Sequence, residues 1–398
     1  MELEFSIIGD YIPPLSDIIA EFERANDVAV HIRQMSWDNA WQELLSIAFQ
    51  GHGPDVSQIG STWASSLIKM NVLRPFSKAE VTGLGGSSTF LSSSWSSALV
   101  PDAADIYAIP WTSYVFMLVY RRDLFQRARV DESAAFQSTE SLAQAIEHLQ
   151  AAGVQTPWLV PSCTRHIDTL HYTASWVWEY GGDFISGDGK TPLFTHPQTI
   201  AGLKAYFELF RYLPPEAQGL DDEGCLAYFR EGKAALTICG MDAPYAMLDS
   251  PGILSWPVKN LGVARMPGAQ WIGGDNLVIW REAALSLKRE RLAIELVKYL
   301  TSKEVQLAFC EAGAFNAPTR LDVLSELPFP GSQVNRVTRE ALRAGRPYPS
   351  LALWGRVENQ LSAALNQIGC EVIQGKPSEE AIREYLEPLE LRLRIVLS

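Results

Sequence analysis

A chain of 398 residues, 47% of them hydrophobic and 20% charged, has the composition of a globular protein and the length of two domains. Its formal net charge of -13 argues against nucleic acid or an anionic membrane surface as a partner, because no cluster of Lys and Arg reverses that field locally. No stretch of about 20 apolar residues that could span a bilayer is present. A neutral ligand remains compatible with this charge.

The first part of the chain alternates strands with helices. Strands are expected at 3–8, 28–32 and 55–59, because each is a short apolar run bounded by turn residues. Helices are expected after each strand. Their apolar faces are Leu15, Ile18, Ile19 and Phe22, then Trp41, Leu44, Leu45 and Ala48, then 62–70. This order predicts an α/β domain with a mainly parallel sheet.

The next two segments break that pattern. Residues 77–98 are rich in Ser and Gly and predict a surface loop with little regular structure. Residues 106–120 are apolar and aromatic but contain Pro110, which predicts two extended pieces that meet at a bend. A chain can cross between two lobes at such a bend.

The pattern then restarts and continues to the end of the chain. Strands are expected at 234–239, 261–266 and 277–280, and a helix at 142–152. Thr301 and Glu304 have the spacing of a capping box for a helix that reaches Glu311. Two further helices finish the chain. Their apolar faces are Val357, Leu361, Leu365 and Ile368, and then Ile382, Tyr385, Leu389 and Leu393.

The usual catalytic motifs are missing from the sequence. It has no GxSxG, HExxH, P-loop or GxGxxG motif. His166 and His171 lie five residues apart, which is the wrong spacing for two metal ligands on one helical face. The five cysteines show no CxxC spacing and are expected to be small buried residues. We therefore expect no enzyme, no metal and no cofactor. A pair of carboxylates in a glycoside hydrolase remains an alternative, which the sequence does not support.

Tryptophan is the unusual feature. Of the 12 tryptophans, Trp37, Trp63, Trp111 and Trp271 follow or interrupt strand-like segments and have polar neighbours. Ligands bind beyond the carboxyl ends of strands in open α/β sheets. An indole face matches the apolar C–H face of a pyranose ring, and polar side chains match its hydroxyls. The alternative is that these rings are core anchors, which is the favoured interpretation for Trp176, Trp178 and Trp280.

Five segments, in order, resemble one known family. They are GPDVSQIG (53–60), IYAIPWTSYVFMLVYRRDLF (106–125), FREGKAALTICG (229–240), WIGGDNLVI (271–279) and AIELVKYLTSKEVQLAFCEAGAFNAPTR (293–320). Together they resemble the extracellular solute-binding proteins of ABC importers, in the maltose-binding-like, carbohydrate-binding branch. One departure is that Met241 and Asp242 stand where the family often has a Trp.

The resemblance implies a type II periplasmic-binding-protein fold with two α/β lobes, a hinge and a ligand cleft between the lobes. Lobe I would comprise residues 1–113 with 262–316, and lobe II residues 114–261 with 317–398, including the C-terminal helices. The resemblance also implies a monomer that works with ABC permease subunits. It implies a periplasmic or lipid-anchored extracellular protein whose export signal has been removed, since none is found at Met1.

The expected function is reversible binding of a mono- or oligosaccharide. The four loop tryptophans would stack on sugar, four aspartates would accept hydroxyls, and Arg320 is as consistent with a structural ion pair as with a ligand contact. A polyamine or peptide on the same fold is the alternative, since acidic residues suit a polyamine. The expected ligand-binding residues are Asp10, Tyr11, Trp37, Asp38, Ser61, Thr62, Trp63, Trp111, Thr112, Tyr114, Asp242, Trp271, Gly273, Gly274, Asp275, Asn316, Arg320 and Trp354.

Overall fold

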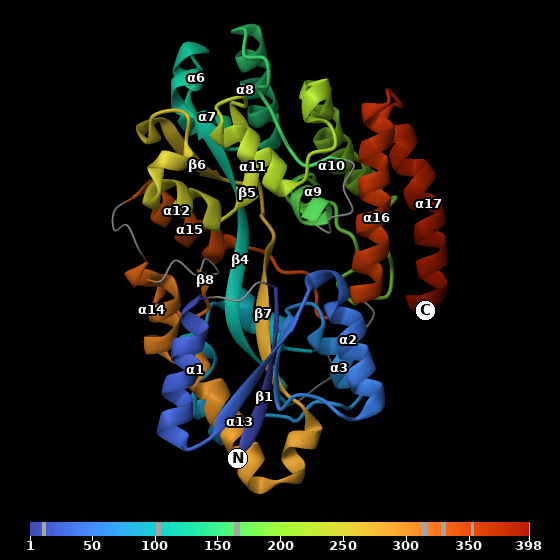
Figure 1. Cartoon of the computed structure of the whole chain (residues 1–398). Coiled ribbons are helices and arrows are strands. Elements are labelled where there is room, and N and C mark those ends of the chain that lie inside the picture. Colours follow the sequence, from blue (N-terminus) through green and yellow to red (C-terminus); the bar gives the residue numbers. More distant parts are fainter. Residues whose placement is uncertain are drawn as a thin grey trace. The chain divides into compact units, whose positions relative to one another are not determined.

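The chain begins with a strand that becomes the middle of a parallel sheet. In the computed structural model, β1 (Glu2–Ile8, labelled in Figure 1) lies between β2 (Ala29–Met35) and β3 (Val56–Gly60) and runs parallel to both. The helices α1 (Pro13–Asn26) and α2 (Trp37–Gln50) connect these strands. This confirms the alternation predicted from the sequence, to within a few residues at each boundary.

The structure describes residues 1–9, 13–100, 105–162, 168–311, 317–327, 332–351 and 354–397. The chain forms two compact units, each described here by itself. Unit 1 is Met1–Tyr114, Ile272–Gly331 and Pro347–Gly355, and unit 2 is Val115–Trp271, Ser332–Arg346 and Arg356–Ser398. The predicted lobes differ from these units at residues 114, 262–271, 317–331 and 347–355, and the lobe boundaries stay a prediction.

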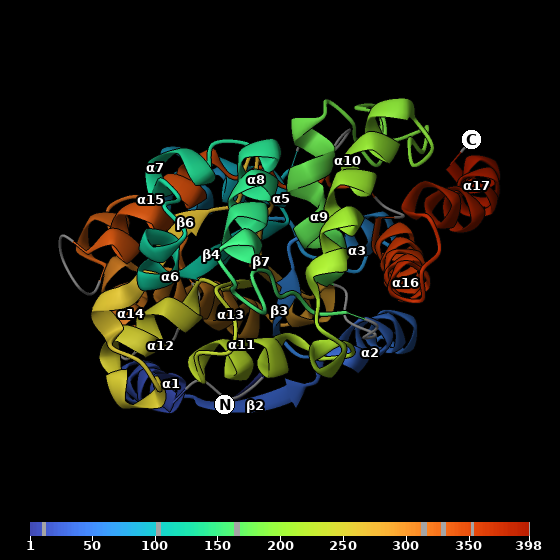
Figure 2. The ribbon, with the colours of Figure 1, turned by 90° about the horizontal axis from the view of Figure 1, so that it is seen from above.

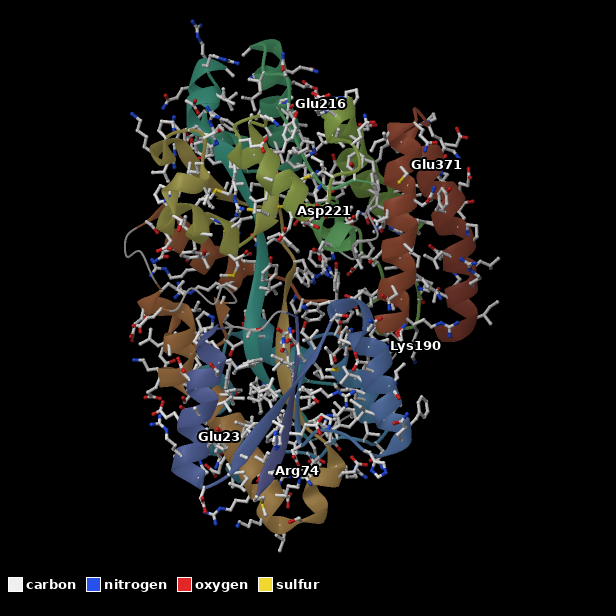
Figure 3. All side chains as sticks on the ribbon, viewed as in Figure 1. Glu23, Arg74, Lys190, Glu216, Asp221 and Glu371 are labelled. Carbon is white, nitrogen blue, oxygen red and sulfur yellow. The ribbon has the colours of Figure 1, made fainter. Side chains whose placement is uncertain are left out.

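Unit 1 extends the parallel sheet with antiparallel strands. β7 (Ile272–Ile279) pairs antiparallel with β3, and β4 (Ala108–Arg121) is its next hydrogen-bonded neighbour. The two-residue strand β8 (Ala317–Pro318) pairs with β4. Glu23 on α1 accepts a 2.6 Å hydrogen bond from the backbone N–H of Val30, which fixes α1 beside β2 (Figure 3).

The sheet of unit 1 has a hydrophobic core on each face, because successive side chains of a strand point to opposite sides. Leu277 and Ile279 of β7 join the core formed with α1, α13 (Leu287–Leu300) and α14 (Lys303–Glu311). Val278 and Trp280 join the other core, formed with α2 and α3 (Ala64–Lys69). The indole N–H of the fully buried Trp280 donates to Ser57 Oγ at 2.7 Å.

The prediction of a loop over 77–98 is wrong. The structure has α4 (Lys78–Gly83), a 3-10 turn at Ser87–Thr89 and α5 (Ser92–Ala98). Ser77 and Glu80 form a capping box, the S-x-x-E signal that the sequence carries ahead of α4. Glu80 also pairs with Arg74, whose Nε donates to Glu290 at 2.6 Å (Figure 3). These contacts, together with buried serines on α5, outweigh the weak helix propensity of Ser.

Two other local predictions are also corrected. The expected bend at Pro110 is absent, and β4 is one continuous strand that passes from unit 1 into unit 2. Pro110 has no N–H to donate, but its carbonyl is still paired, because it accepts a 3.0 Å hydrogen bond from the hydroxyl of Thr319. The cap of α14 is Ser302, which accepts from Val305 N, while Thr301 donates back to the Val297 carbonyl of α13.

Unit 2 is built around the second half of β4. β5 (Leu236–Gly240) and β6 (Leu261–Arg265) both pair antiparallel with β4. Helices surround this small sheet. They are α6 (Arg122–Arg127), α7 (Glu132–Ala135), α8 (Thr139–Ala151), α9 (Asp168–Glu179), α10 (Pro197–Phe207), α11 (Asp222–Arg230), α12 (Asp242–Asp249) and α15 (Gln333–Ala344), with 3-10 turns at Glu208–Tyr212, Pro215–Ala217, Pro251–Ile253 and Val258–Asn260.

The last two helices are the predicted pair. α16 (Trp354–Ile373) and α17 (Ser378–Leu397) lie side by side (Figures 1 and 2). Leu361 and Leu365 of α16, and Ile382 and Leu389 of α17, are buried, as their spacing predicts. Among the described residues, no helix is both long and apolar enough to cross a membrane.

Candidate functional site

Three tryptophans of unit 1 form a cluster at one edge of its sheet. Trp37 follows β2 and Trp63 follows β3, so both lie beyond the carboxyl ends of parallel strands. The Trp63 ring centroid lies 5.8 Å from that of Trp37 and 5.5 Å from that of Trp41. Trp37 remains 51% exposed, whereas Trp63 is 9% exposed. The structure therefore brings together two predicted site residues and presents one indole to solvent.

The turn after β3 fixes where Trp63 lies. Trp63 N donates to the Gly60 carbonyl at 3.0 Å, and Ser61 N donates to the Gly274 carbonyl of β7 at 2.9 Å. The Trp63 ring lies directly over Gly60, since a Cβ built there would come within 3.3 to 3.6 Å of the indole. The loop from Ser61 to Trp63 is therefore anchored to β7, and Thr62 within it is buried.

A buried carboxyl group lies opposite Gly60 in the β3–β7 ladder. Asp275 is 4% exposed, and its Oδ2 accepts a 2.8 Å hydrogen bond from the hydroxyl of Thr112 on β4. Burial raises the pKa of Asp275 to about 6, although Thr112 and Gln58 act in the opposite direction. Gly274 has a φ of 133°, and a Cβ there would lie 2.1 Å from the Thr112 carbonyl oxygen, so only glycine fits.

Two of the predicted tryptophans lie in cores. Trp111 is 2% exposed and makes edge-on contacts with Phe5 and Phe309, both at 5.9 Å between centroids. Trp354 is fully buried beside Tyr348. This burial favours a packing role for both rings in the described conformation. Their expected role in the site stays a prediction.

Trp271, in unit 2, belongs to a buried aromatic stack. Its ring lies 3.8 Å from that of His171, with 4° between the two planes, and Phe116 stacks at 5.7 Å between centroids. Trp271 is 9% exposed. Burial lowers the pKa of His171 to about 3, so the imidazole facing Trp271 is neutral at physiological pH. One face of Trp271 is therefore occupied by protein.

The remaining predicted residues are dispersed. Asp242 opens α12 in unit 2, where a carboxylate suits the helix dipole. Arg320 forms a bidentate ion pair with Asp322, with both hydrogen bonds at 3.0 Å. This matches the structural ion pair that was one of its two expected roles. Tyr114 ends unit 1 in β4 and is half-buried, and Gly273 lies in β7. Asp10, Tyr11 and Asn316 lie outside the described residues, as does the side chain of Asp38 in the first turn of α2.

Other titratable side chains of unit 2 interact with neighbouring protein groups. Burial, with added repulsion from Asp222 and Glu358, raises the pKa of Asp168 at the start of α9. Arg346 lies over the ring of Trp178, 4.6 Å from its centroid, and pairs with Asp183. Within the described part of the chain, no group of three or more His, Cys, Asp or Glu is arranged to hold a metal ion.

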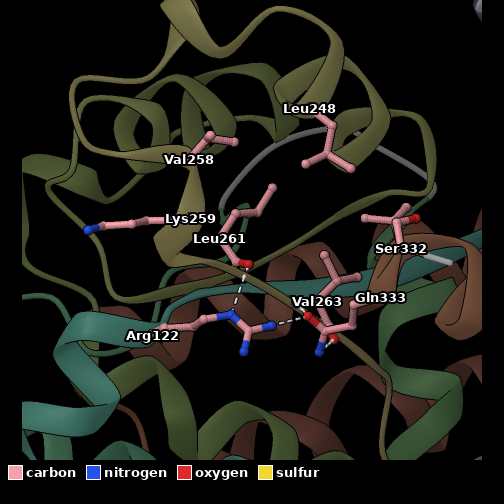
Figure 4. A pocket seen from close by; sticks show the side chains of 9 residues that line it. Arg122, Leu248, Val258, Lys259, Leu261, Val263, Ser332 and Gln333 are labelled. Atoms are coloured by element: carbon pink, nitrogen blue, oxygen red, sulfur yellow. Dashed lines mark hydrogen bonds between the residues drawn. The ribbon is translucent and has the colours of Figure 1, made fainter. Parts of the chain in front are cut away.

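A pocket of about 300 Å³ lies in unit 2 (Figure 4). Its polar groups are mostly committed to protein partners. Arg122 Nε donates to the Leu261 carbonyl at 3.1 Å, its Nη2 donates to Gln333, and Gln333 Nε2 donates to the Val263 carbonyl at 2.8 Å. The rest of the lining is mainly apolar. None of the predicted site residues lines this pocket.

The Trp37–Trp41–Trp63 cluster offers an exposed aromatic face next to polar loop groups, which can stack on an apolar ring face without chemical change. Sequence reasoning placed Trp41 only on a buried helical face and so missed its part in the cluster. The signal was present, because Trp37 and Trp41 are four residues apart and lie on one side of α2. The stack of Phe116 and His171 on Trp271 had no local signal.

Comparison with known proteins gives a family match over most of the chain. A family model described as bacterial extracellular solute-binding protein matches residues 17–330. No curated protein matches the chain at a significant level.

Solved structures of the same fold cover nearly the whole chain. An ABC transporter solute-binding protein of Thermotoga lettingae bound with α-D-tagatose has a TM-score of 0.81 at 20% identity, covering 100% of both chains. Maltose-bound MalE3 of T. maritima has a TM-score of 0.81 at 21% identity, covering 99% of both. A solute-binding protein of Agrobacterium radiobacter with ribitol has 0.77 at 19%, covering 99% of this chain and 98% of that one. These likenesses confirm the predicted α/β, two-lobed fold class.

Proposed function

The chain belongs to the family of bacterial extracellular solute-binding proteins, and from this premise we propose that it binds a carbohydrate reversibly as the substrate-binding component of an ABC importer. The observation that carries the choice of a carbohydrate is the tryptophan cluster of unit 1. Trp37 presents a half-exposed indole at the carboxyl edge of the sheet, and Trp41 and Trp63 support it.

Stacking on this cluster suits a sugar for a physical reason. One face of a pyranose carries only C–H groups, which an indole ring can cover, while its hydroxyls need hydrogen-bond partners around the rim. The side chain of the half-buried Ser61 lies in the same loop as Trp63, and its hydroxyl can serve that rim. An isolated exposed Trp would offer the first kind of contact without the second.

The comparisons support the proposal without identifying the sugar. The similar structures described above contain a ketohexose, a disaccharide and a sugar alcohol, so the fold itself accommodates small polyols and longer saccharides. The formal charge of -13 fits a neutral ligand and is unsuited to an anionic one.

The partners and location follow from the same proposal. The family is one of extracellular proteins. We propose that this chain acts as a monomer in the periplasm or as a lipid-anchored protein outside the cell, and delivers its ligand to membrane permease subunits. We propose no catalytic step, since binding and release alone serve this role.

A thermal-shift screen tests the proposal. Maltose, longer maltooligosaccharides, D-tagatose and ribitol would each be added to the native protein, with spermidine and a short peptide as the competing ligand classes. A ligand at about 100 times its dissociation constant should stabilise the folded state by about 2.7 kcal/mol. Stabilisation by spermidine or peptide, with none by any saccharide, would overturn the carbohydrate assignment.

Incubation with end-labelled oligosaccharides tests the absence of turnover. The expected result is that the label is recovered on the intact saccharide after binding and release. Stoichiometric excess of a cleaved product over protein would show catalysis and would replace the binding role with that of a carbohydrate-active enzyme.

A further inference from the structure

Residues 274 and 275 of β7 lie directly beneath the loop that carries Trp63. Gly60 faces Asp275 across the β3–β7 ladder, and the Trp63 ring covers Gly60. Ser61 N donates to the Gly274 carbonyl at 2.9 Å. A displacement of Gly274 or Asp275 therefore acts on the loop that positions Trp63, and through it on Trp37 and Trp41.

Asp275 also ties β7 to β4. Its Oδ2 accepts the 2.8 Å hydrogen bond from Thr112, while Oδ1 has no hydrogen-bond partner of normal geometry among the described residues. Gln58 accepts a bond from Ile8 N at 2.9 Å through its Oε1, which leaves only its amide N–H groups to face the carboxyl. The backbone of Gly274 lies so close to the Thr112 carbonyl that no side chain fits between the two strands at this point.

Among the residues that the structure describes, those around Asp275 are uncharged. β3 contributes Gln58 and Gly60, β4 contributes Thr112, and the neighbours along β7 are Gly274 and Asn276. Burial raises the pKa of Asp275 to about 6, the hydrogen bonds of Thr112 and Gln58 lower it, and no charged residue contributes to the shift. A carboxyl group that is buried without a countercharge changes its protonation state close to neutral pH.

We infer that Asp275 is a pH-responsive positioning residue for the Trp63 loop, and that its ionised form holds the tryptophan cluster in its ligand-ready arrangement. The ionised carboxylate can only accept hydrogen bonds, so it keeps the Thr112 hydroxyl pointed at β7. The protonated carboxyl keeps an oxygen that can accept from Thr112, but the bond loses its charge assistance and weakens. The Thr112 bond adds a side-chain contact to the pairing of β7 with β4, beside the Gly274 carbonyl that holds Ser61, so its weakening loosens the support of the Trp63 loop.

The consequence for ligand binding rests on the function proposed above. If the ionised form is the ligand-ready one, ligand affinity is highest above pH 6 and falls as Asp275 takes up a proton. By linkage, bound ligand lowers the pKa of Asp275 by a matching amount. We expect the affinity to fall about fivefold between pH 7.5 and pH 5, at the low end of typical couplings between sites.

Fluorine NMR of the ligand-free protein labelled with 5-fluorotryptophan tests the inference without any ligand. The Trp63→Phe variant identifies the Trp63 resonance. In the native protein this resonance should shift with pH, with a midpoint near 6. In Asp275→Asn it should stay constant over the same range. Thr112→Val should move the midpoint to higher pH, because it removes a donor that lowers the pKa of the carboxyl.

The outcomes separate this inference from the proposed function. A Trp63 resonance that does not titrate near pH 6, or that titrates identically in Asp275→Asn, would overturn the positioning role whether or not a sugar binds. Binding of maltose, D-tagatose or ribitol with equal affinity at pH 5 and 7.5 would refute the coupling to ligand and leave the proposed function standing. Failure of every saccharide to bind would refute the proposed function alone.

Discussion

The two units each gather aromatic rings, and they do so in opposite ways. In unit 1 the Trp37–Trp41–Trp63 cluster leaves Trp37 half-exposed, and a buried acid lies beneath its loop. In unit 2 the stack of Phe116, His171 and Trp271 is closed, because an imidazole covers one face of the indole at 3.8 Å. Trp63 and Trp271 are therefore equally buried in different surroundings: the first ring contacts the half-exposed Trp37, and the second is stacked against an imidazole.

The pH dependence of the two regions should also be opposite. The pKa of Asp275 is raised, so stability is lost as pH rises from about 3.9, the pKa in the unfolded chain, to about 6. The pKa of His171 is lowered, so the unfolded state takes up a proton first and stability is lost as pH falls below about 6.5. Variants of the two regions can therefore be compared by whether they remove a loss of stability at rising pH or at falling pH.

The largest effect should come from Trp271→Ala. Truncating a buried Trp in a packed core costs about 3–5 kcal/mol, so the midpoint of urea unfolding should fall sharply. Trp37→Ala is the matched control in unit 1 and should cost less than about 1 kcal/mol, because its ring is half in solvent. Equal losses in the two variants would remove the distinction between an open platform and a closed stack.

Asp275→Asn should remove the pH-dependent loss of unfolding free energy that ionisation of the buried carboxyl group causes. A shift from about 3.9 in the unfolded chain to about 6 corresponds to about 2–3 kcal/mol. Relative to the variant, the native protein should lose that amount of unfolding free energy between about pH 4 and 6, and none further above pH 7. Urea titrations across this range provide the measurement. A constant difference between the two proteins would show that Asp275 does not titrate there.

His171→Phe should change the stability profile in the opposite direction. The native histidine should lose about 2 kcal/mol of stability between pH 6.5 and 5, at about 1.4 kcal/mol per pH unit, and phenylalanine has no group that takes up a proton. The variant keeps an aromatic ring against Trp271. The comparison is of slopes, so a constant packing loss does not obscure it. Parallel profiles for the two proteins would contradict a buried neutral imidazole.

Trp37→Ala should weaken saccharide binding by about tenfold, or about 1.4 kcal/mol, and leave the unfolding temperature nearly unchanged. Titration calorimetry with the saccharide found in the thermal-shift screen provides the measurement. Phe49→Ala is the matched control, because Phe49 is also on α2 and is 80% exposed, at the opposite end of the helix. If both variants bind as the native protein does, the cluster of unit 1 does not form the stacking surface.

Local periodicity was enough to predict most elements. The apolar faces of α1, α16 and α17 are buried where their spacing indicates, because one side of a helix follows directly from a 3.6-residue repeat. The predictions are wrong where one capping residue, or a hydrogen bond from a distant segment, determines the local structure. Ser77 and Glu80 begin a helix inside a Ser-rich stretch, and Thr319 provides a partner for the Pro110 carbonyl within a continuous β4.

The sequence by itself determined the alternation of strands and helices and the family resemblance, because these depend on neighbours in the chain. Only the tertiary structure decided that Trp63 supports an open cluster, that Trp111 is a core residue and that His171 covers Trp271. It also decided that Asp275 lies buried between β3 and β4, with no countercharge beside it in the described part of the chain. The exposure and the pKa of a side chain depend on which distant segments pack around it, and the spacing of residues along the chain does not predict those contacts.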